Sequence, residues 1–190
     1  MDRRLDKTRR RRELIVEAAV DCFAEKGFHQ SSMRDIAAHA GVSLGNLYNH
    51  FASKSDLIVE IARLEARDMK TLLTRMDGEG KPQGIILQML EQLWDDCRDP
   101  LLGRLSLEIM AEASRNNEIY RLFEQNRQMR ASILSEKIQQ SLSTRGDQLL
   151  VAEALIDLVE AKALREAIEE PETPTATFET LKPLILKLIS

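Results

Sequence analysis

Apolar positions recur along this chain with the spacing of amphipathic helices. Between residues 15 and 23 they fall at i, i+3, i+4, i+7 and i+8, which places them on one helical face. The same spacing returns in the stretches 85–97, 148–169 and 178–189. No alternating pattern typical of a β-strand runs for any length. The pattern therefore predicts an all-α protein of about nine helices.

The stretch 32–51, SMRDIAAHAGVSLGNLYNHF, predicts two short helices joined by a tight turn. Ser32 and Asp35 have the spacing of a capping box at the start of the first helix. Gly41 follows that helix, at a position that favours a residue tolerating positive φ. A helix, a glycine turn and a second helix of this length form the helix-turn-helix pattern.

The second helix of this pair, Ser43–Phe51, combines a buried seam with a polar outer face. Ser43 has the position of its N-cap, and Leu47 and Phe51 lie one turn apart on one side. The residues directed away from the seam carry little charge; they are Leu44, Gly45, Asn46, Tyr48, Asn49 and His50. Such a face fits a DNA major groove, and a solvated face on a helical hairpin is the alternative.

The segment GVSLGNLYNHFASKSDL closely resembles the recognition segment of the TetR family of bacterial repressors. The preceding AAVDCFAEKGFHQSSMRDIAAHA resembles the first two helices of the same domain. The likeness covers about residues 8–57, and beyond about residue 60 only an all-helical character is shared. The resemblance implies a DNA-binding domain at residues 1–55 and a helical ligand-binding and dimerisation domain at residues 56–190.

Charge is spread unevenly along the 190 residues, whose net charge is −4. Residues 1–55 carry 10 Lys+Arg and 7 Asp+Glu, whereas residues 56–190 carry 17 and 24. A basic amino-terminal part joined to an acidic remainder suits a protein that presents one end to DNA.

Seven basic residues lie within residues 1–12, and the first helix is expected to start near Thr8. On that expectation Arg9–Arg12 occupy the first turn, where their charges oppose the helix dipole. The conflict suggests an external anion such as DNA phosphate, and a solvated, disordered arm at residues 1–6 is the alternative.

Several classes of protein are disfavoured by the sequence. The chain has no run of 18 apolar residues, so no membrane span is expected. The charged amino terminus does not resemble a secretory signal, and a location in the cytoplasm is therefore expected. Cys22 and Cys97 do not make a disulfide framework. No paired Cys/His metal spacing, Gly-rich phosphate loop or nucleophile–base motif is present, so neither an enzyme, a metal site nor a cofactor is expected.

The remaining helices are expected at residues 54–75, 85–97, 101–113, 118–143, 148–169 and 178–189, with a loop at 77–84. The last two are too apolar for packing on one side only. TetR-like proteins pair through their final two helices, which implies a homodimer here, and an intramolecular core is the alternative. The family often has a small residue midway along the penultimate helix, whereas this chain has residues 157–160 as DLVE, which leaves the interface geometry open.

Roles on DNA follow from side-chain chemistry and from the resemblance. Phosphate contacts are assigned to Ser32, Ser43, Tyr48, His50 and Lys54. Base-edge reading is assigned to Arg34, Leu44, Asn46 and Asn49. Gly45 would allow close approach to the groove, and Tyr48 as a half-buried core residue is the alternative to its phosphate role. The substitution Lys54→Ala is expected to weaken binding to all DNA sequences alike.

The family encloses an inducer pocket between helices of its regulatory region. The large, soft side chains in the corresponding region are Met89, Leu93, Trp94, Cys97, Leu105, Ile109, Met110 and Phe123. Glu108 and Glu112 lie one turn apart nearby, which suggests a cationic inducer. A plain packed core is the alternative, since methionine at helical spacing commonly fills gaps. The function expected is a ligand-responsive repressor that binds a palindromic operator; an activator, or a regulator without a small-molecule inducer, is the alternative.

Overall fold

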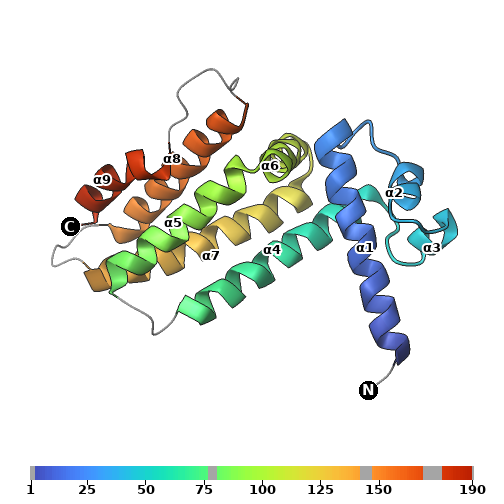
Figure 1. Cartoon of the computed structure of the whole chain (residues 1–190), viewed down its shortest axis with the longest axis horizontal. Helices are drawn as coiled ribbons and strands as arrows, with labels where there is room; N and C mark the ends of the chain where they lie inside the picture. The colour runs from blue at the N-terminus through green and yellow to red at the C-terminus, as the bar shows by residue number, and fades with distance from the viewer. Residues whose placement is uncertain (1–2, 77–80, 142–146, 169–176, 190) are drawn as a thin grey trace. The chain divides into compact units, whose positions relative to one another are not determined.

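The computed structural model describes residues 3–76, 81–141, 147–168 and 177–189. Within these residues the chain forms nine α-helices and no strand, which confirms the all-α prediction. In order, the helices are α1 (Arg3–Lys26), α2 (Met33–His39), α3 (Leu44–Tyr48), α4 (Lys54–Met76), α5 (Pro82–Arg98), α6 (Pro100–Ala113), α7 (Asn117–Ser141), α8 (Gln148–Ile168) and α9 (Phe178–Leu188) (Figure 1).

The helices group into two compact units. Unit 1 comprises Met1–Ala66 and Arg104–Phe123, and unit 2 comprises Arg67–Gly103 and Glu124–Ser190. Three helices, α4, α6 and α7, contribute residues to both units. The functional boundary at residue 55 stays a prediction.

The core of unit 1 forms where the apolar face of α1 meets the short helices. Ile15, Ala19 and Phe23 on α1 are each at most 1% exposed, as their spacing predicts. α1 packs against α2, and α2 packs against α3. Leu47 and Phe51 are buried as well, so the predicted seam of the second short helix is confirmed. Burying each large apolar side chain contributes roughly 1.5–3 kcal/mol.

Side-chain caps begin both short helices, as predicted. The Ser32 hydroxyl accepts a hydrogen bond from the Asp35 N–H (3.1 Å), and the Asp35 carboxylate accepts one from the Ser32 N–H (2.9 Å). The hydrogen bonds from Ser32 also hold the pKa of Asp35 below its usual value. The Ser43 hydroxyl accepts from the Asn46 N–H (3.2 Å) and caps α3.

The turn between α2 and α3 is a Schellman motif built on Gly41. Gly41 has φ +64°, its N–H donates to the Ala38 carbonyl (3.2 Å), and the Val42 N–H donates to the Ala37 carbonyl (2.9 Å). These bonds satisfy carbonyls that the end of α2 would leave unpaired. The turn therefore sets the direction in which α3 leaves α2.

Two predicted helix starts were wrong. α1 begins at Arg3 rather than near Thr8, because arginine, lysine and leucine all favour helix. Arg9–Arg12 consequently lie beyond the first turn, and the argument from the helix dipole does not apply to them. α5 begins at Pro82 rather than residue 85, because proline is well suited to the first helical position.

The starts of α6 and α7 follow the expected caps. The Asp99 carboxylate accepts from the N–H groups of Leu101 (3.0 Å) and Leu102 (2.9 Å). Either Asn116 or Asn117 had the position to cap α7. The structure selects Asn116, whose amide oxygen accepts from the Glu118 N–H (3.0 Å).

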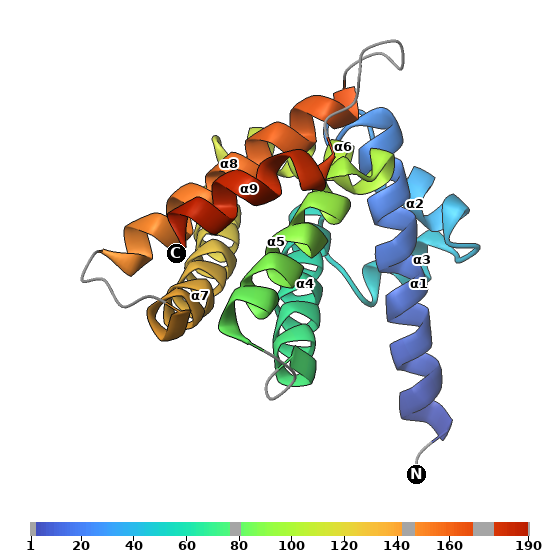
Figure 2. The same ribbon diagram turned by 60° about the vertical axis from the view of Figure 1, so that its left-hand side comes forward.

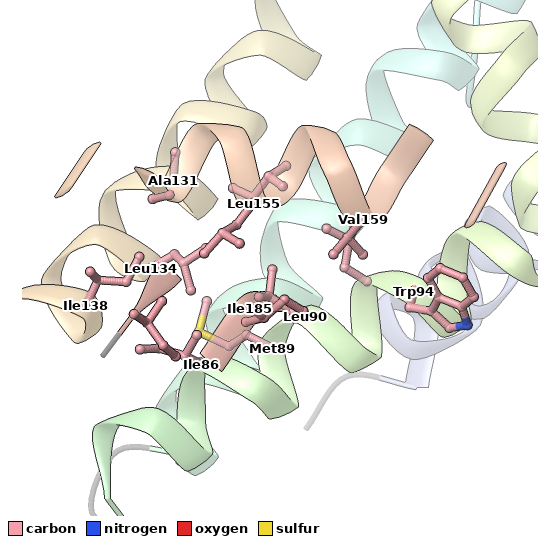
Figure 3. Packing of buried hydrophobic residues seen from close by; sticks show 14 of the residues in the cluster. Ile86, Met89, Leu90, Trp94, Ala131, Leu134, Ile138, Leu155, Val159 and Ile185 are labelled. Carbon is pink, nitrogen blue, oxygen red and sulfur yellow. The ribbon is translucent and has the colours of Figure 1, made fainter. Parts of the chain in front are cut away.

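The core of unit 2 is formed by α5, α7, α8 and α9. α5 packs against both α8 and α9, and α9 lies alongside α8 (Figures 1 and 2). Figure 3 shows Leu90 of α5 beside Ile185 of α9. Trp94 of α5 is buried, with its ring 6.5 Å from that of Phe178.

The apolar stripe predicted within residues 148–169 runs from Leu149 to Ile168, and it is buried through most of its length. Its first position differs, since Leu149 is 46% exposed. The side chain of Ile168, at the other end of the stripe, lies outside the described residues. In the part of the chain that the structure describes, no helix is long and apolar enough to cross a membrane.

Gly41→Ala is expected to destabilise unit 1 by about 1–2 kcal/mol, because an L-residue is strained in the left-handed region. Gly45 is the matched control: it lies inside α3, and at both glycines an added Cβ would meet no atom within 4 Å. Gly45→Ala should be neutral or stabilise by about 0.5–1 kcal/mol. Urea unfolding measures both, and equal effects would contradict the role given to the Gly41 backbone.

Candidate nucleic-acid interface

α3 exposes the face that the sequence assigns to DNA. Leu47 and Phe51 are buried against unit 1, whereas Gly45, Tyr48 and Asn49 are exposed. Tyr48 is 50% exposed, so it is placed at the surface rather than in the core. The α-helix is shorter than the predicted Ser43–Phe51, because Asn49 is its C-cap. Backbone hydrogen bonds from the next two residues to the Leu47 carbonyl continue the turn.

Asn46 lies at the edge of this face with an unsatisfied acceptor. Its backbone N–H bonds the Ser43 hydroxyl, while its buried Oδ1 has no hydrogen-bond partner among the described residues. A buried acceptor without a partner is costly, and the exocyclic amino group of adenine is a donor that asparagine binds in the major groove. Because Oδ1 is buried, the amide would have to turn outward to reach a base edge, and the base-reading role of Asn46 stays a prediction.

The serines assigned to phosphate contacts are both engaged as caps. The hydroxyls of Ser32 and Ser43 bond the first turns of α2 and α3. Arg34, in the first turn of α2, is exposed and makes no ion pair within the described part of the chain. Leu44, next to Ser43, is partly exposed. None of these positions conflicts with the predicted DNA contacts, which stay predictions.

Lys54 holds the turn that follows α1. Its ammonium donates to the carbonyls of Phe28 and, at 3.4 Å, of His29, and it lies 4.5 Å from the centre of the Phe28 ring. Burial lowers the pKa of Lys54. Its predicted phosphate contact stays untested, but Lys54→Ala would also remove these contacts and is not a clean probe of DNA binding.

Arg12 is a structural residue that the sequence interpretation missed. Its guanidinium donates to the His50 carbonyl (3.2 Å) and to the Glu60 carboxylate (2.8 Å), and it lies 4.2 Å above the centre of the Phe51 ring. It thus joins α1 to the residues that follow α3 and to α4. One signal was available, because Arg12 precedes Ile15 by three residues and so borders the buried stripe.

His50 lies next to this guanidinium. Burial lowers the pKa of His50, and the positive charges of Arg12 and Arg11 lower it further. The imidazole is therefore neutral near pH 7, and positive charge at this edge of the interface comes from guanidinium groups.

The candidate ligand residues are divided between the two units. Met89, Leu93, Trp94 and Cys97 belong to the packed core of unit 2. In unit 1, Leu105 and Ile109 are buried, Phe123 is partly buried and Met110 is 57% exposed. The exposure of Met110 does not suit an enclosed pocket, and the lining as a whole stays a prediction.

The two carboxylates considered for a cationic inducer both contact the turn after α1 within unit 1. Glu108 accepts a hydrogen bond from the Phe28 N–H (2.8 Å), and Glu112 lies 3.3 Å from the imidazole of His29. Neither contact neutralises the carboxylates, and the buried Oε2 of Glu112 has no hydrogen-bond partner among the described residues, so the cationic inducer stays a prediction. Among the described residues, no group of His, Cys, Asp or Glu side chains is arranged to hold a metal ion.

Arg12→Lys and Arg12→Gln are expected to destabilise unit 1 by about 1–2 kcal/mol, because neither side chain reproduces the forked guanidinium contacts. Both should weaken DNA binding, while the salt dependence of the remaining affinity stays that of the wild type. Thermal unfolding and fluorescence-anisotropy titrations at several salt concentrations provide the measurements. Arg12→Lys keeps the positive charge and Arg12→Gln removes it. If the dependence of DNA affinity on salt became weaker only in Arg12→Gln, Arg12 would instead be a phosphate contact.

Comparisons with known proteins agree with this geometry. Residues 15–61 match the sequence model of the bacterial regulatory proteins of the tetR family. The HTH-type transcriptional repressor KstR2 of Mycobacterium tuberculosis is 28% identical over 145 residues, which are 74% of this chain and 72% of that protein. The repressor DhaR of Mycobacterium sp. strain GP1 is 29% identical over 187 residues, 90% of this chain and 92% of DhaR.

A solved structure extends the likeness to the whole fold. The TetR-like transcriptional regulator from Rhodococcus sp. RHA1 has a TM-score of 0.70 and 25% identity, over 94% of this chain and 93% of that one. The matched residues 15–61 contain α2, the Gly41 turn and α3. The chain therefore carries a DNA-binding domain of the tetR family at residues 15–61, and it is a DNA-binding transcriptional regulator.

Proposed function

We propose that this regulator is a repressor that binds a two-fold symmetric operator as a dimer, with α3 of each copy in a major groove. The observation that carries the proposal is the exposed polar face of α3 above the buried Leu47 and Phe51. Two relatives, KstR2 and DhaR, are named repressors, which supports the direction of control. Such a regulator acts where the chromosome is, in the bacterial cytoplasm.

Phosphate and base contacts are proposed to be separated along the motif. Hydroxyl, imidazole and ammonium groups at the helix ends set the register on the backbone, and side chains of α2 and α3 read base edges. Phosphates are assigned to Ser32, Ser43, Tyr48, His50 and Lys54, and bases to Arg34, Leu44, Asn46 and Asn49. Gly45 allows the α3 backbone to lie close to the duplex, because it adds no side chain at an exposed position.

The dimer is proposed to form through α8 and α9, because unit 2 leaves large apolar side chains of both helices at its surface. Leu149 and Leu150 at the start of α8 are 46% and 61% exposed. Leu184 and Leu188, one turn apart on α9, are 45% and 46% exposed. A second copy that covers these leucines removes apolar surface from water and supplies the two reading helices that a two-fold site requires.

Control by a small molecule is proposed to act through the helical residues 56–190. A ligand that favours one arrangement of these helices would shift the population of dimers whose reading helices match successive grooves. Control by a protein partner or by protein level, and activation instead of repression, are the competing functions.

Asn46→Ala should relax the preference for one base pair in each half-site, at a cost of roughly 1–3 kcal/mol for the preferred base. Tyr48→Phe removes only an exposed hydroxyl, so it should weaken binding to all DNA sequences equally. Genomic footprinting identifies the operator. Titrations of each protein variant against single-base variants of that operator then measure its preference for each base pair. If both variants lose affinity uniformly, the proposed division between base and phosphate contacts is wrong.

The double variant Leu184→Glu/Leu188→Glu should convert the dimer into a monomer with its helical content retained, because the interface would then bury carboxylates. The double variant Leu107→Glu/Met110→Glu is the control, since these residues of α6 are also exposed (37% and 57%) but lie outside the proposed interface. Light scattering and circular dichroism measure mass and helicity. A wild-type monomer, or equal dissociation of both variants, would contradict the α8–α9 interface.

A further inference from the structure

The basic run of α1 divides by helical face into residues with different environments. Lys7, Arg10 and Arg11 stand at i, i+3 and i+4, so they share one face. Arg9 lies on the opposite side of the helix, where it pairs with Glu13 at 3.7 Å. Arg12 is engaged by the His50 carbonyl and by Glu60. We call Lys7, Arg10 and Arg11 the α1 cationic stripe.

Within the described residues, the three cations of the stripe have no ionic partner. Lys7 and Arg10 are exposed and Arg11 is partly exposed, and none of the three makes a hydrogen bond or ion pair with another described residue. Like charges at i, i+3 and i+4 repel each other and disfavour the helix. An anion outside the described chain would relieve this repulsion.

The stripe lies beside the recognition segment. Arg12, next to Arg11, contacts the backbone of His50 and the ring of Phe51, directly after α3. The positive charge of Arg11 is close enough to act on His50. From there, the amino-terminal turns of α1 extend past α2 and α3 (Figures 1 and 2). A duplex bound to α3 would therefore continue towards the stripe.

The spacing of the stripe suits a phosphate backbone. Lys7 and Arg11 are separated by one helical turn, a rise of about 6 Å. Each strand of B-DNA places one phosphate per about 3.4 Å of helix axis, so the stripe spans about two phosphate intervals and can reach three successive phosphates. Lysine and arginine side chains bind phosphate without reading sequence.

We propose that Lys7, Arg10 and Arg11 form a second DNA contact, which binds phosphates of the duplex flanking the half-site read by α3. This inference rests on the proposed operator binding by α3. It adds a part of the DNA footprint that depends on duplex length and salt but not on base sequence.

The test compares operator duplexes of two lengths, one ending at the half-sites and one with ten further base pairs on each side. Wild-type protein should bind the longer duplex more tightly, whatever the sequence of the added pairs. The triple variant Lys7→Gln/Arg10→Gln/Arg11→Gln should lose this preference for length. Its slope of log K against log salt should fall by about 2.7 for each bound protomer, about 0.9 for each cation removed.

Arg9→Gln and Arg10→Gln form the matched pair, since they remove one charge each from adjacent positions on different faces. Arg10→Gln should lower the salt slope by about 0.9 per protomer, and Arg9→Gln should leave slope and length preference unchanged. Thermal unfolding shows whether each variant is folded. If both substitutions changed the salt slope equally, the proposal would be wrong, because the net charge of the protein rather than the stripe would then determine the slope.

Two further outcomes separate this inference from the operator proposal. A triple variant that keeps the wild-type slope and length preference overturns the stripe contact alone, provided that Asn46→Ala still changes base preference on the short duplex. Failure of wild-type protein to bind the short duplex overturns the operator proposal and the stripe with it. Wild-type binding to vesicles of phosphatidylglycerol, lost in the triple variant and without any dependence on duplex length, would assign the stripe to a lipid surface instead.

Discussion

The burial of Leu47 and Phe51 is the contact on which the DNA-binding surface depends. These two side chains fix which face of a five-residue helix points outward, and a helix that short has almost no stability of its own. The caps and the Gly41 turn set its ends, and the Arg12 guanidinium covers the Phe51 ring. The polar face of α3 is thus positioned by groups that need not touch DNA at all.

Much of unit 1 could be predicted because its determinants are local. The capping box of Ser32 and Asp35, the turn at Gly41 and the buried stripe of α1 each follow from spacing within a few residues. Arg12 and Lys54 could not be placed in this way, because their partners lie 38 and 26 residues away along the sequence. A basic run is uniform as a sequence, but folding gives neighbouring members different environments.

In unit 2, the spacing of apolar residues predicts the helices but not all of their partners. The spacing of apolar residues identified α5, α8 and α9 as helices, and their buried faces form one core. Spacing does not say whether a second apolar face is covered by the same chain or by another copy. The exposed leucines of α8 and α9 supply that information only after the intramolecular partners are known. Ligand residues are harder still, because buried methionine and tryptophan look alike in a solid core and in a pocket wall.

The turn after α1 receives contacts from two helices at once. Lys54 of α4 binds its carbonyls, while Glu108 and Glu112 of α6 bind the Phe28 N–H and the His29 ring. Hydrogen bonds tolerate little change in length, so a sideways slip of α6 by about 1 Å would disrupt the bond from the Phe28 N–H to Glu108. A displacement of α6 can therefore act directly on the turn at the carboxyl end of α1, without a movement of α4. Substitutions at this turn could therefore change the position of α1 without altering any residue of α3.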